Sequence, residues 1–123
     1  MEYINKNEEL LNKSISGKYY ILDSQITRLE IYFENHQLYI DVYFSLPYHR
    51  FKADKNLKLH FIGVIEYEFY WNDKFNFYTV ERYKLFKSEK GFYLSVDPYD
   101  ESESILDEDH GIILCNEIEG YFI

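Results

Sequence analysis

Residues 28–46 decide the fold class, and they read RLEIYFENHQLYIDVYFSL. Apolar and polar side chains alternate on both sides of Asn35-His36, as in strands that have one covered face. Two residues join the runs, and asparagine tolerates the positive φ of so tight a turn. Pro47 ends the second run, because proline cannot donate to a ladder. The stretch predicts an antiparallel hairpin whose core-facing parity holds Leu29, Ile31, Phe33, Leu38, Ile40, Val42, Phe44 and Leu46.

A third alternating run follows the hairpin, from Leu57 to Trp71. Gly63 interrupts it and predicts a bulge or bend. Asn72-Asp73-Lys74 then predicts a turn. One parity of this run collects the large apolar residues Leu59, Phe61, Ile65, Tyr67, Phe69 and Trp71.

More strands are predicted towards the C-terminus. Residues 77–86 pair with residues 92–96 across the loop Ser88–Gly91, whose glycine suits a left-handed position. Residues 111–115 and 118–123 are apolar and β-branched, and they predict one interrupted strand or two short ones.

The chain opens on a short predicted helix. Asn5 or Asn7 caps it, and Glu8 and Glu9 suit the positive end of its dipole. Ser16-Gly17 ends it. Residues 18–22 add a possible strand before the hairpin.

Together these elements predict one domain, residues 1–123, of the mainly β (α+β) class. We expect an antiparallel meander sheet of six to eight strands, strongly curled or two-layered, with a short N-terminal helix. Consecutive hairpins favour a meander, because parallel neighbours would need longer crossovers.

The acidic charge is concentrated in the last quarter of the chain. Residues 1–90 hold 13 Asp or Glu and all 13 Lys or Arg, whereas residues 91–123 hold nine acids and no Lys or Arg. The formal net charge of −9 therefore belongs to the C-terminal segment. Such a balance argues against nucleic-acid binding, which needs clustered basic residues.

Cysteine usage and hydropathy bear on the compartment. Cys115 is the single cysteine, so an internal disulfide is excluded. The N-terminus lacks the basic and then apolar order of a signal peptide, and no apolar run is long enough to span a bilayer. We expect a cytoplasmic protein with no membrane contact.

The acidic run from Asp97 to Gly111 raises the question of calcium. An EF-hand loop needs glycine at position 6 and a glutamate at position 12, and Asp107-x-Asp109-x-Gly111 lacks both. Two other interpretations remain. One is a solvated loop in which Ser104 caps a helical turn over residues 105–109. The other is an acidic surface that binds a partner.

Catalytic chemistry finds little support in the sequence. The acids Glu30, Glu34, Asp41, Glu66 and Glu68 lie on strand faces, where solubility explains them. The histidines His36, His49, His60 and His110 lack the spacing of metal ligands. Cys115 lies in an apolar run and reads as a buried thiol. We expect no cofactor and no metal, and a non-enzymatic role.

Tyr32, Tyr39 and Tyr43 fall on the hairpin parity opposite the core residues, together with several acids. Tyrosine offers a large contact area at a low cost in conformational entropy, and its hydroxyl adds a polar contact. The three rings therefore predict a recognition surface or, alternatively, a second core layer.

Two resemblances to known groups of proteins bear on the function. The segments Tyr93–Glu101, Asp107–Gly111 and Ile118–Phe122 resemble a group of small uncharacterised bacterial proteins. The opening helix, the segment Asp23-Ser24-Gln25-Ile26 and the acidic β body are similar, more loosely, to acidic immunity proteins of bacterial polymorphic toxin systems. The second resemblance implies a protein that inhibits a toxin by binding it.

We therefore expect an immunity-type protein-binding module, a monomer or weak dimer, that docks an acidic, tyrosine-bearing surface on a basic protein partner. The alternative is a small-ligand binder or enzyme with an aromatic-lined pocket in a curled sheet or barrel. A structural subunit that pairs through a sheet edge or face is a third possibility. The residues expected to bind the partner are Asp97, Tyr99, Asp100, Glu101, Asp107, Asp109, Tyr32, Tyr39 and Tyr43.

Overall fold

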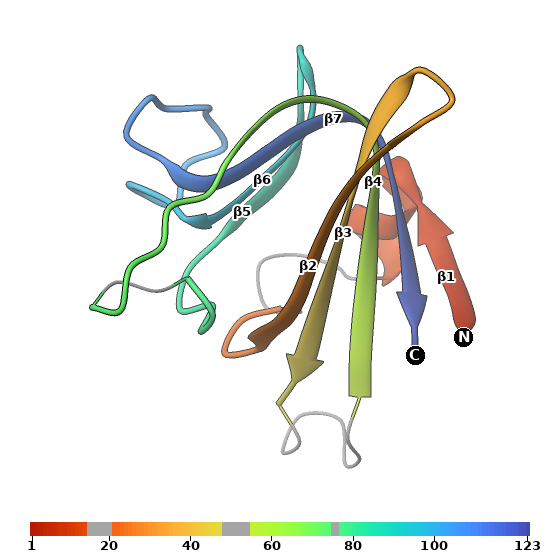
Figure 1. Cartoon of the computed structure of the whole chain (residues 1–123), viewed down its shortest axis with the longest axis horizontal. Coiled ribbons are helices and arrows are strands. Elements are labelled where there is room, and N and C mark those ends of the chain that lie inside the picture. Colours follow the sequence, from red (N-terminus) through yellow and green to blue (C-terminus); the bar gives the residue numbers. More distant parts are fainter. Residues whose placement is uncertain (15–20, 48–54, 75–76) are drawn as a thin grey trace.

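A computed structural model describes residues 1–14, 21–47, 55–74 and 77–123 of the chain. Strands dominate it (Figure 1). In chain order the elements are β1 (Glu2–Lys6), α1 (Asn7–Glu9), the π-helical turn η1 (Leu10–Ser14), β2 (Gln25–Glu34), β3 (Gln37–Leu46), β4 (Lys55–Glu68), β5 (Lys84–Ser88), β6 (Gly91–Asp97) and β7 (His110–Phe122).

The strands form one seven-stranded antiparallel sheet in the order β2-β3-β4-β7-β6-β5, and β1 also pairs with β7. β7 is the central strand. One of its edges pairs with β4 along most of its length, from Phe122 to Ile112. The other edge pairs first with β6 and then with β1. The sheet therefore has two halves joined by the long strands β4 and β7, which arch between them in Figure 1.

The predicted class is confirmed: the described chain is mainly β and antiparallel, with seven strands and a short N-terminal helix. A single meander is wrong. β2-β3-β4 and β5-β6-β7 are two separate meanders, and β4 lies next to β7 rather than β5. The sheet is also neither closed nor strongly curled. Periodicity describes each strand by itself and carries no information on which distant strand lies beside it.

The predicted N-terminal helix is present, but its start and its cap differ from the prediction. Residues 2–6 form a strand, and the helix begins at Asn7 after the N-cap residue Lys6, which makes no side-chain cap hydrogen bond. Asn7 instead accepts a hydrogen bond from the Ile118 amide, so the predicted asparagine cap is wrong. The predicted end at residues 16–17 lies outside the described residues. Of the possible strand at 18–22, only Ile21 and Leu22 are described, and they are not in a strand.

The predicted hairpin is present. Asn35 and His36 have φ values of 51° and 65°, as the tight turn requires, and Glu34 pairs with Gln37 at its base. Ile31 and Phe33 lie on the core parity, but they are 41% and 67% exposed. β2 is the last strand in the sheet order, so the far end of this strand lies beyond the area that the core covers.

The β4 pattern holds only as far as Gly63. Leu59 and Phe61 are fully buried, as predicted. Gly63 then adopts a φ of +65°, and the pairing with β7 shifts register between Val64 and Glu66. This irregularity reverses the alternation, since one extra residue moves later side chains to the other face. Of the predicted core residues beyond this point, Ile65 and Tyr67 are exposed, as is Trp71, which follows the end of β4. Phe69 is partly buried and packs against the core as predicted.

The C-terminal half contains the predicted hairpin of β5 and β6, closed by Ser88–Gly91. Residues 77–83 are not part of β5. Thr79 forms an isolated bridge with Gln25, and hydrogen bonds join residues 23–26 to residues 78–80. The closing segment is one continuous strand, β7, so it is neither the interrupted strand nor the two short strands that the sequence predicts.

The apolar core unites residues from almost every element. Its largest fully buried side chains include Phe44, Phe61, Leu10, Ile21, Ile40, Leu57, Leu59, Leu94, Ile113 and Ile118.

Candidate functional site

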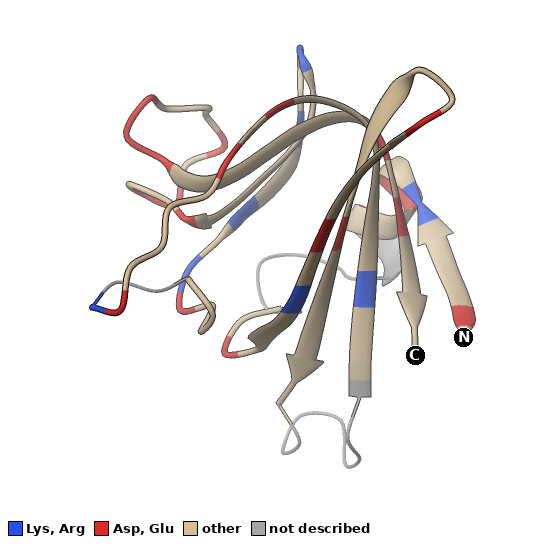
Figure 2. Ribbon diagram, in the orientation of Figure 1, with Lys and Arg blue, Asp and Glu red and all other residues tan. Residues whose placement is uncertain are grey.

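Two polar networks stand out in the described part of the chain, and each is centred on a buried aspartate. The first lies under the acidic loop, which we define as residues 98–109 between β6 and β7. Figure 2 shows Asp and Glu residues spread along this loop. The second lies on the β2-β3-β4 half of the sheet and includes the predicted tyrosines.

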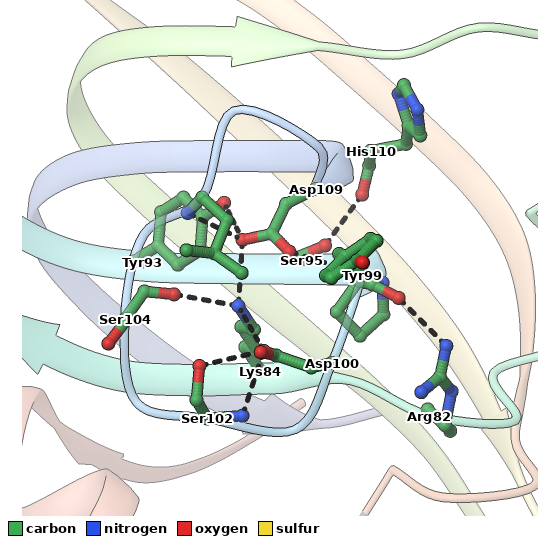
Figure 3. A network of polar contacts seen from close by, with 12 residues as sticks. Arg82, Lys84, Tyr93, Ser95, Tyr99, Asp100, Ser102, Ser104, Asp109 and His110 are labelled. Carbon is green, nitrogen blue, oxygen red and sulfur yellow. Dashed lines mark hydrogen bonds and ion pairs between the residues drawn. The ribbon is translucent and has the colours of Figure 1, made fainter.

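Asp109 anchors the acidic loop from below. Its residue is 5% exposed, and its carboxylate accepts four hydrogen bonds (Figure 3). Lys84 Nζ and the Tyr93 hydroxyl donate to Oδ2 at 3.0 and 2.8 Å. The backbone amides of Tyr99 and Leu106 donate to Oδ1 and Oδ2, at 2.9 and 3.1 Å. The carboxylate thus ties both arms of the loop to strands β5 and β6.

Lys84 is the buried cation of this network, with a side chain that is 1% exposed. Besides Asp109, its ammonium donates to the Ser104 carbonyl at 2.7 Å and lies 3.1 Å from Asp100 Oδ1. An ammonium has three donors, so these contacts use all of them. The positive charge therefore neutralises carboxylates inside the protein.

The electrostatics agree with the geometry. Burial acts to raise the pKa of the Asp109 carboxyl, but hydrogen bonds from the Tyr99 amide, Tyr93, the Leu106 amide and Lys84 outweigh it, and the pKa lies below its ordinary value. Burial and the bond to this carboxylate raise the pKa of Tyr93. Asp109 is ionised and Tyr93 is a neutral donor at neutral pH.

Further hydrogen bonds shape the rest of the loop. Asp100 accepts from the Ser102 amide and hydroxyl at 3.1 and 2.7 Å, and these bonds, with Lys84, lower the pKa of its carboxyl. Arg82 donates to the Pro98 carbonyl at 3.0 Å. The predicted helical turn capped by Ser104 is wrong, because residues 105–109 contain only a turn at 107–108.

The structure places the six residues predicted in or next to the acidic loop in different environments. Tyr99 is 65% exposed, and Glu101 and Asp107 are also exposed. Asp97 and Asp100 are half-buried. Asp109 is internal, and its carboxylate is committed to the contacts just described.

Asp41 is the centre of the second network, on β3. It is 4% exposed, and its Oδ1 contacts His60 Nδ1 while Oδ2 accepts from the Tyr32 hydroxyl at 2.9 Å. Lys58 Nζ lies 3.8 Å from Oδ2. Burial acts to raise the pKa of Asp41, but the hydrogen bonds with His60 and Tyr32 and the nearby Lys58 ammonium lower it overall.

Aromatic rings pack around Asp41. The Tyr39 ring stacks between Tyr32 and His60, with centroids 5.4 Å away on both sides and interplanar angles of 14° and 8°. Lys58 lies over the Tyr43 ring at 5.8 Å. Cross-strand pairing explains the cluster, since Tyr32 is opposite Tyr39 and Asp41 is opposite His60. We call Tyr32, Tyr39, Asp41, Tyr43, Lys58 and His60 the tyrosine face.

The two predicted sets of partner-binding residues therefore lie apart. The acidic loop belongs to the β5-β6 half of the sheet, whereas Tyr32, Tyr39 and Tyr43 belong to β2 and β3 (Figure 1). All three tyrosines are half-buried on one polar face, as their parity predicts.

The sequence reasoning missed the basic members of both networks. Lys84 lies between Tyr83 and Leu85, and a cation in an apolar run was a usable signal for a buried ion pair. His60 and Lys58 lie on the polar parity of β4, but nothing in the sequence placed β4 beside Asp41.

The single cysteine lies outside both networks. Cys115 is fully buried, and burial raises the pKa of its thiol to about 12.

Within the described ranges no three His, Cys, Asp or Glu side chains gather in a way that could hold a metal ion. No helix in the described part is long and apolar enough to cross a membrane. A cleft of about 450 Å³ is lined by Lys74, Phe77, Thr79, Glu81, Arg82, Val96, Asp97 and Pro98.

Comparisons with known proteins add no identity. No family model, no curated protein and no solved structure matches this chain.

Proposed function

We propose that this chain is a non-enzymatic protein-binding module, an immunity-type inhibitor whose acidic loop docks on a basic protein. One observation carries the proposal: the loop is rich in exposed carboxylates, yet its backbone is fixed from inside by Asp109 and Lys84. Some residues of the loop therefore supply the exposed charge, and others hold its backbone in place.

The exposed charge of the loop has one sign. Glu101, Glu103, Asp107 and Glu108 are exposed, and no Lys or Arg follows Lys90 in the sequence. Lys84 is buried and paired, so it cancels little of the charge that an approaching molecule meets, whereas the exposed Arg82 lies at the start of the loop, on the Pro98 carbonyl. A surface of this kind attracts basic partners over distances of about 10 Å and speeds their association.

Order in the free loop favours affinity. A flexible loop loses conformational freedom on binding, at about 0.5–1.5 kcal/mol for each immobilised side chain. The Tyr99 and Leu106 amides already hold both arms of this loop on Asp109, and bonds from Lys84 and Tyr93 hold Asp109 on the strands. Tyr99 adds a 65% exposed ring beside the charges, which suits an anchor in a pocket of the partner.

The chemistry of the partner follows from the charge. An enzyme that cleaves nucleic acid carries a basic cleft for phosphate groups, and a fixed acidic loop can occupy that cleft. The proposed partner is therefore a nuclease-type toxin, and binding blocks its substrate site.

The test separates the exposed acids from those that hold the fold. The loop variant carries Glu101→Gln, Glu103→Gln, Asp107→Asn and Glu108→Gln. The control variant carries Glu2→Gln, Glu9→Gln, Glu66→Gln and Glu117→Gln, which remove the same charge from exposed sites away from the acidic loop and from β2. A partner captured from the native lysate is identified, purified and titrated by calorimetry at about 50 and about 200 mM salt.

We expect the loop variant to weaken binding at least about tenfold and to flatten its salt dependence, while the control retains most of the affinity. Equal losses in both variants would mean that only net charge matters. Unchanged binding by the loop variant would overturn the proposal.

A further inference from the structure

We propose that the free edge of β2 pairs with β2 of a second copy of this chain, antiparallel and with a two-fold axis at Ile31, so that two sheets become one. The inference goes beyond the proposed function. It concerns the half of the sheet that does not carry the acidic loop, and it can fail or hold independently of any toxin partner.

Within the part of the chain that the structure describes, the edge is accessible over most of its length. There β2 is the terminal strand of the sheet and its ladder partner is β3. Among the described residues, only its start is covered on the other side, where Gln25 bridges Thr79 and the Ile26 amide donates to the Tyr78 carbonyl at 2.7 Å. An uncovered edge offers a row of backbone donors and acceptors to another strand.

Hairpin geometry tells which residues offer these groups. The two-residue turn makes Glu34 and Gln37 the pair at its base, and alternate residues of β2 direct their N–H and C=O towards β3. The residues between them direct theirs outward. Leu29, Ile31 and Phe33 are these outward residues, and Ile31 and Phe33 are also exposed apolar side chains.

The sequence of β2 is complementary to itself in one antiparallel register. With Ile31 opposite Ile31 of the second copy, Leu29 lies opposite Phe33, Glu30 opposite Tyr32 and Arg28 opposite Glu34. Apolar residues thus meet apolar residues, and opposite charges meet at both ends of the interface. Cross-strand pairs of these kinds stabilise sheets.

Neighbouring registers are worse. A two-fold axis at Glu30 places the two Glu30 carboxylates opposite each other. An axis at Tyr32 places Glu30 opposite Glu34. Like charges directly opposite each other destabilise a strand pair, so both registers are disfavoured.

Pairing also covers the exposed apolar residues. Because the two-fold axis is perpendicular to the sheet, the same face of each copy lies on the same side. Leu29, Ile31 and Phe33 of both copies therefore form one apolar strip across the interface. Arg28 is 66% exposed in its side chain, in a surface pair with Glu30 at 3.3 Å, so it can turn to Glu34 of the second copy.

The first experiment tests the register with cysteine substitutions. In the proposed register the two positions 31 face each other with Cα atoms about 5.5 Å apart, a separation that suits a disulfide. Positions 33 lie four residues apart along the strands, about 13 Å. We expect mild oxidation to cross-link most of Ile31→Cys and little of the matched control Phe33→Cys. Cys115 is buried in the core and does not compete.

The second experiment tests the charged pair by sedimentation of the full chain at about 10 to 500 µM. We expect concentration-dependent dimers for the wild type and about tenfold weaker dimers for Arg28→Glu or Glu34→Arg. The double variant Arg28→Glu/Glu34→Arg restores the pair between copies but not the internal contact of Arg28 with Glu30. Recovery of the dimer in the double variant therefore reports on the interface.

Several outcomes would overturn the proposal. They are a wild type that stays monomeric over the whole concentration range, equal cross-linking at positions 31 and 33, and a double variant no better than the single ones. Circular dichroism of each variant shows whether it is folded, and all four positions lie on an edge strand where substitutions are tolerated.

Discussion

Asp109 and Asp41 are both buried carboxylates with several donors, and they stabilise different kinds of structure. Asp109 accepts two backbone amides from the segment that it belongs to and one ammonium that is 1% exposed. Asp41 lies on a strand that backbone ladders already hold on both sides. Its partners are side chains, and those of His60 and Lys58 are 19% and 18% exposed.

The difference teaches that a buried charge can take the place of secondary structure or add to it. In the acidic loop, side-chain bonds fix a backbone that has no ladder of its own. On the tyrosine face, similar bonds orient rings on a backbone that is already fixed. Loss of Asp109 therefore disorders a segment, whereas loss of Asp41 disturbs only side chains.

The largest effect is expected for Asp109→Asn. The substitution leaves Lys84 buried with only the half-exposed Asp100 as a counter-charge, and breaking such a pair costs about 3 kcal/mol of unfolding free energy. Urea denaturation measures this change, and limited proteolysis within residues 98–109 reports on the loop. Asp107→Asn, an exposed change in the same loop, should stay within about 0.5 kcal/mol. Equal stabilities for the two variants would contradict the anchoring role.

Asp41→Asn should cost less, about 2 kcal/mol, because the Tyr32 and His60 partners retain some access to water. Denaturation again gives the number, and the same proteolysis should find no new cleavage, since the strand backbone is held by β2 and β4. Glu117→Gln, an exposed change on β7, is the matched control. New cleavage in β3 would mean that Asp41 also fixes the backbone.

The smallest effect concerns acid. The pKa values of both Asp41 and Asp109 are lowered in the folded protein. Their stabilisation is thus complete above the unfolded-state value of about 4 and is lost as the pH falls through the folded-state values. Unfolding free energy measured at several pH values should fall below about pH 4 in the wild type. The double variant Asp41→Asn/Asp109→Asn should show a weaker fall, and an identical slope would contradict the assignment.

Local signals predicted a large part of the fold. The turn Asn35-His36, the loop Ser88–Gly91 and the parity of Tyr32, Tyr39 and Tyr43 all follow from residues close together in sequence. Each depends on backbone conformations and periodicities that neighbouring residues determine.

What could not be predicted depends on distant pairs. β1 is short and gains its strand structure from β7 at the other end of the chain. The contact of Lys84 with Asp109 spans 25 residues, and that of Asp41 with His60 spans 19. The shift near Gly63 also escaped the pattern of β4, because a glycine marks a possible bulge without telling its register. Patterns of charge identified the acidic loop, but not the lysine that organises it.

The central position of β7 has a consequence for biosynthesis. β2-β3-β4 and the β5-β6 hairpin can each form from neighbouring residues as the ribosome releases them. β1 and the second edge of β4, in contrast, can pair only with β7, which is synthesised after every other strand of the sheet. Until residues 110–122 emerge, nascent chains expose the unpaired edges of β4 and β6, and chaperones that shield such edges have most to do at that stage.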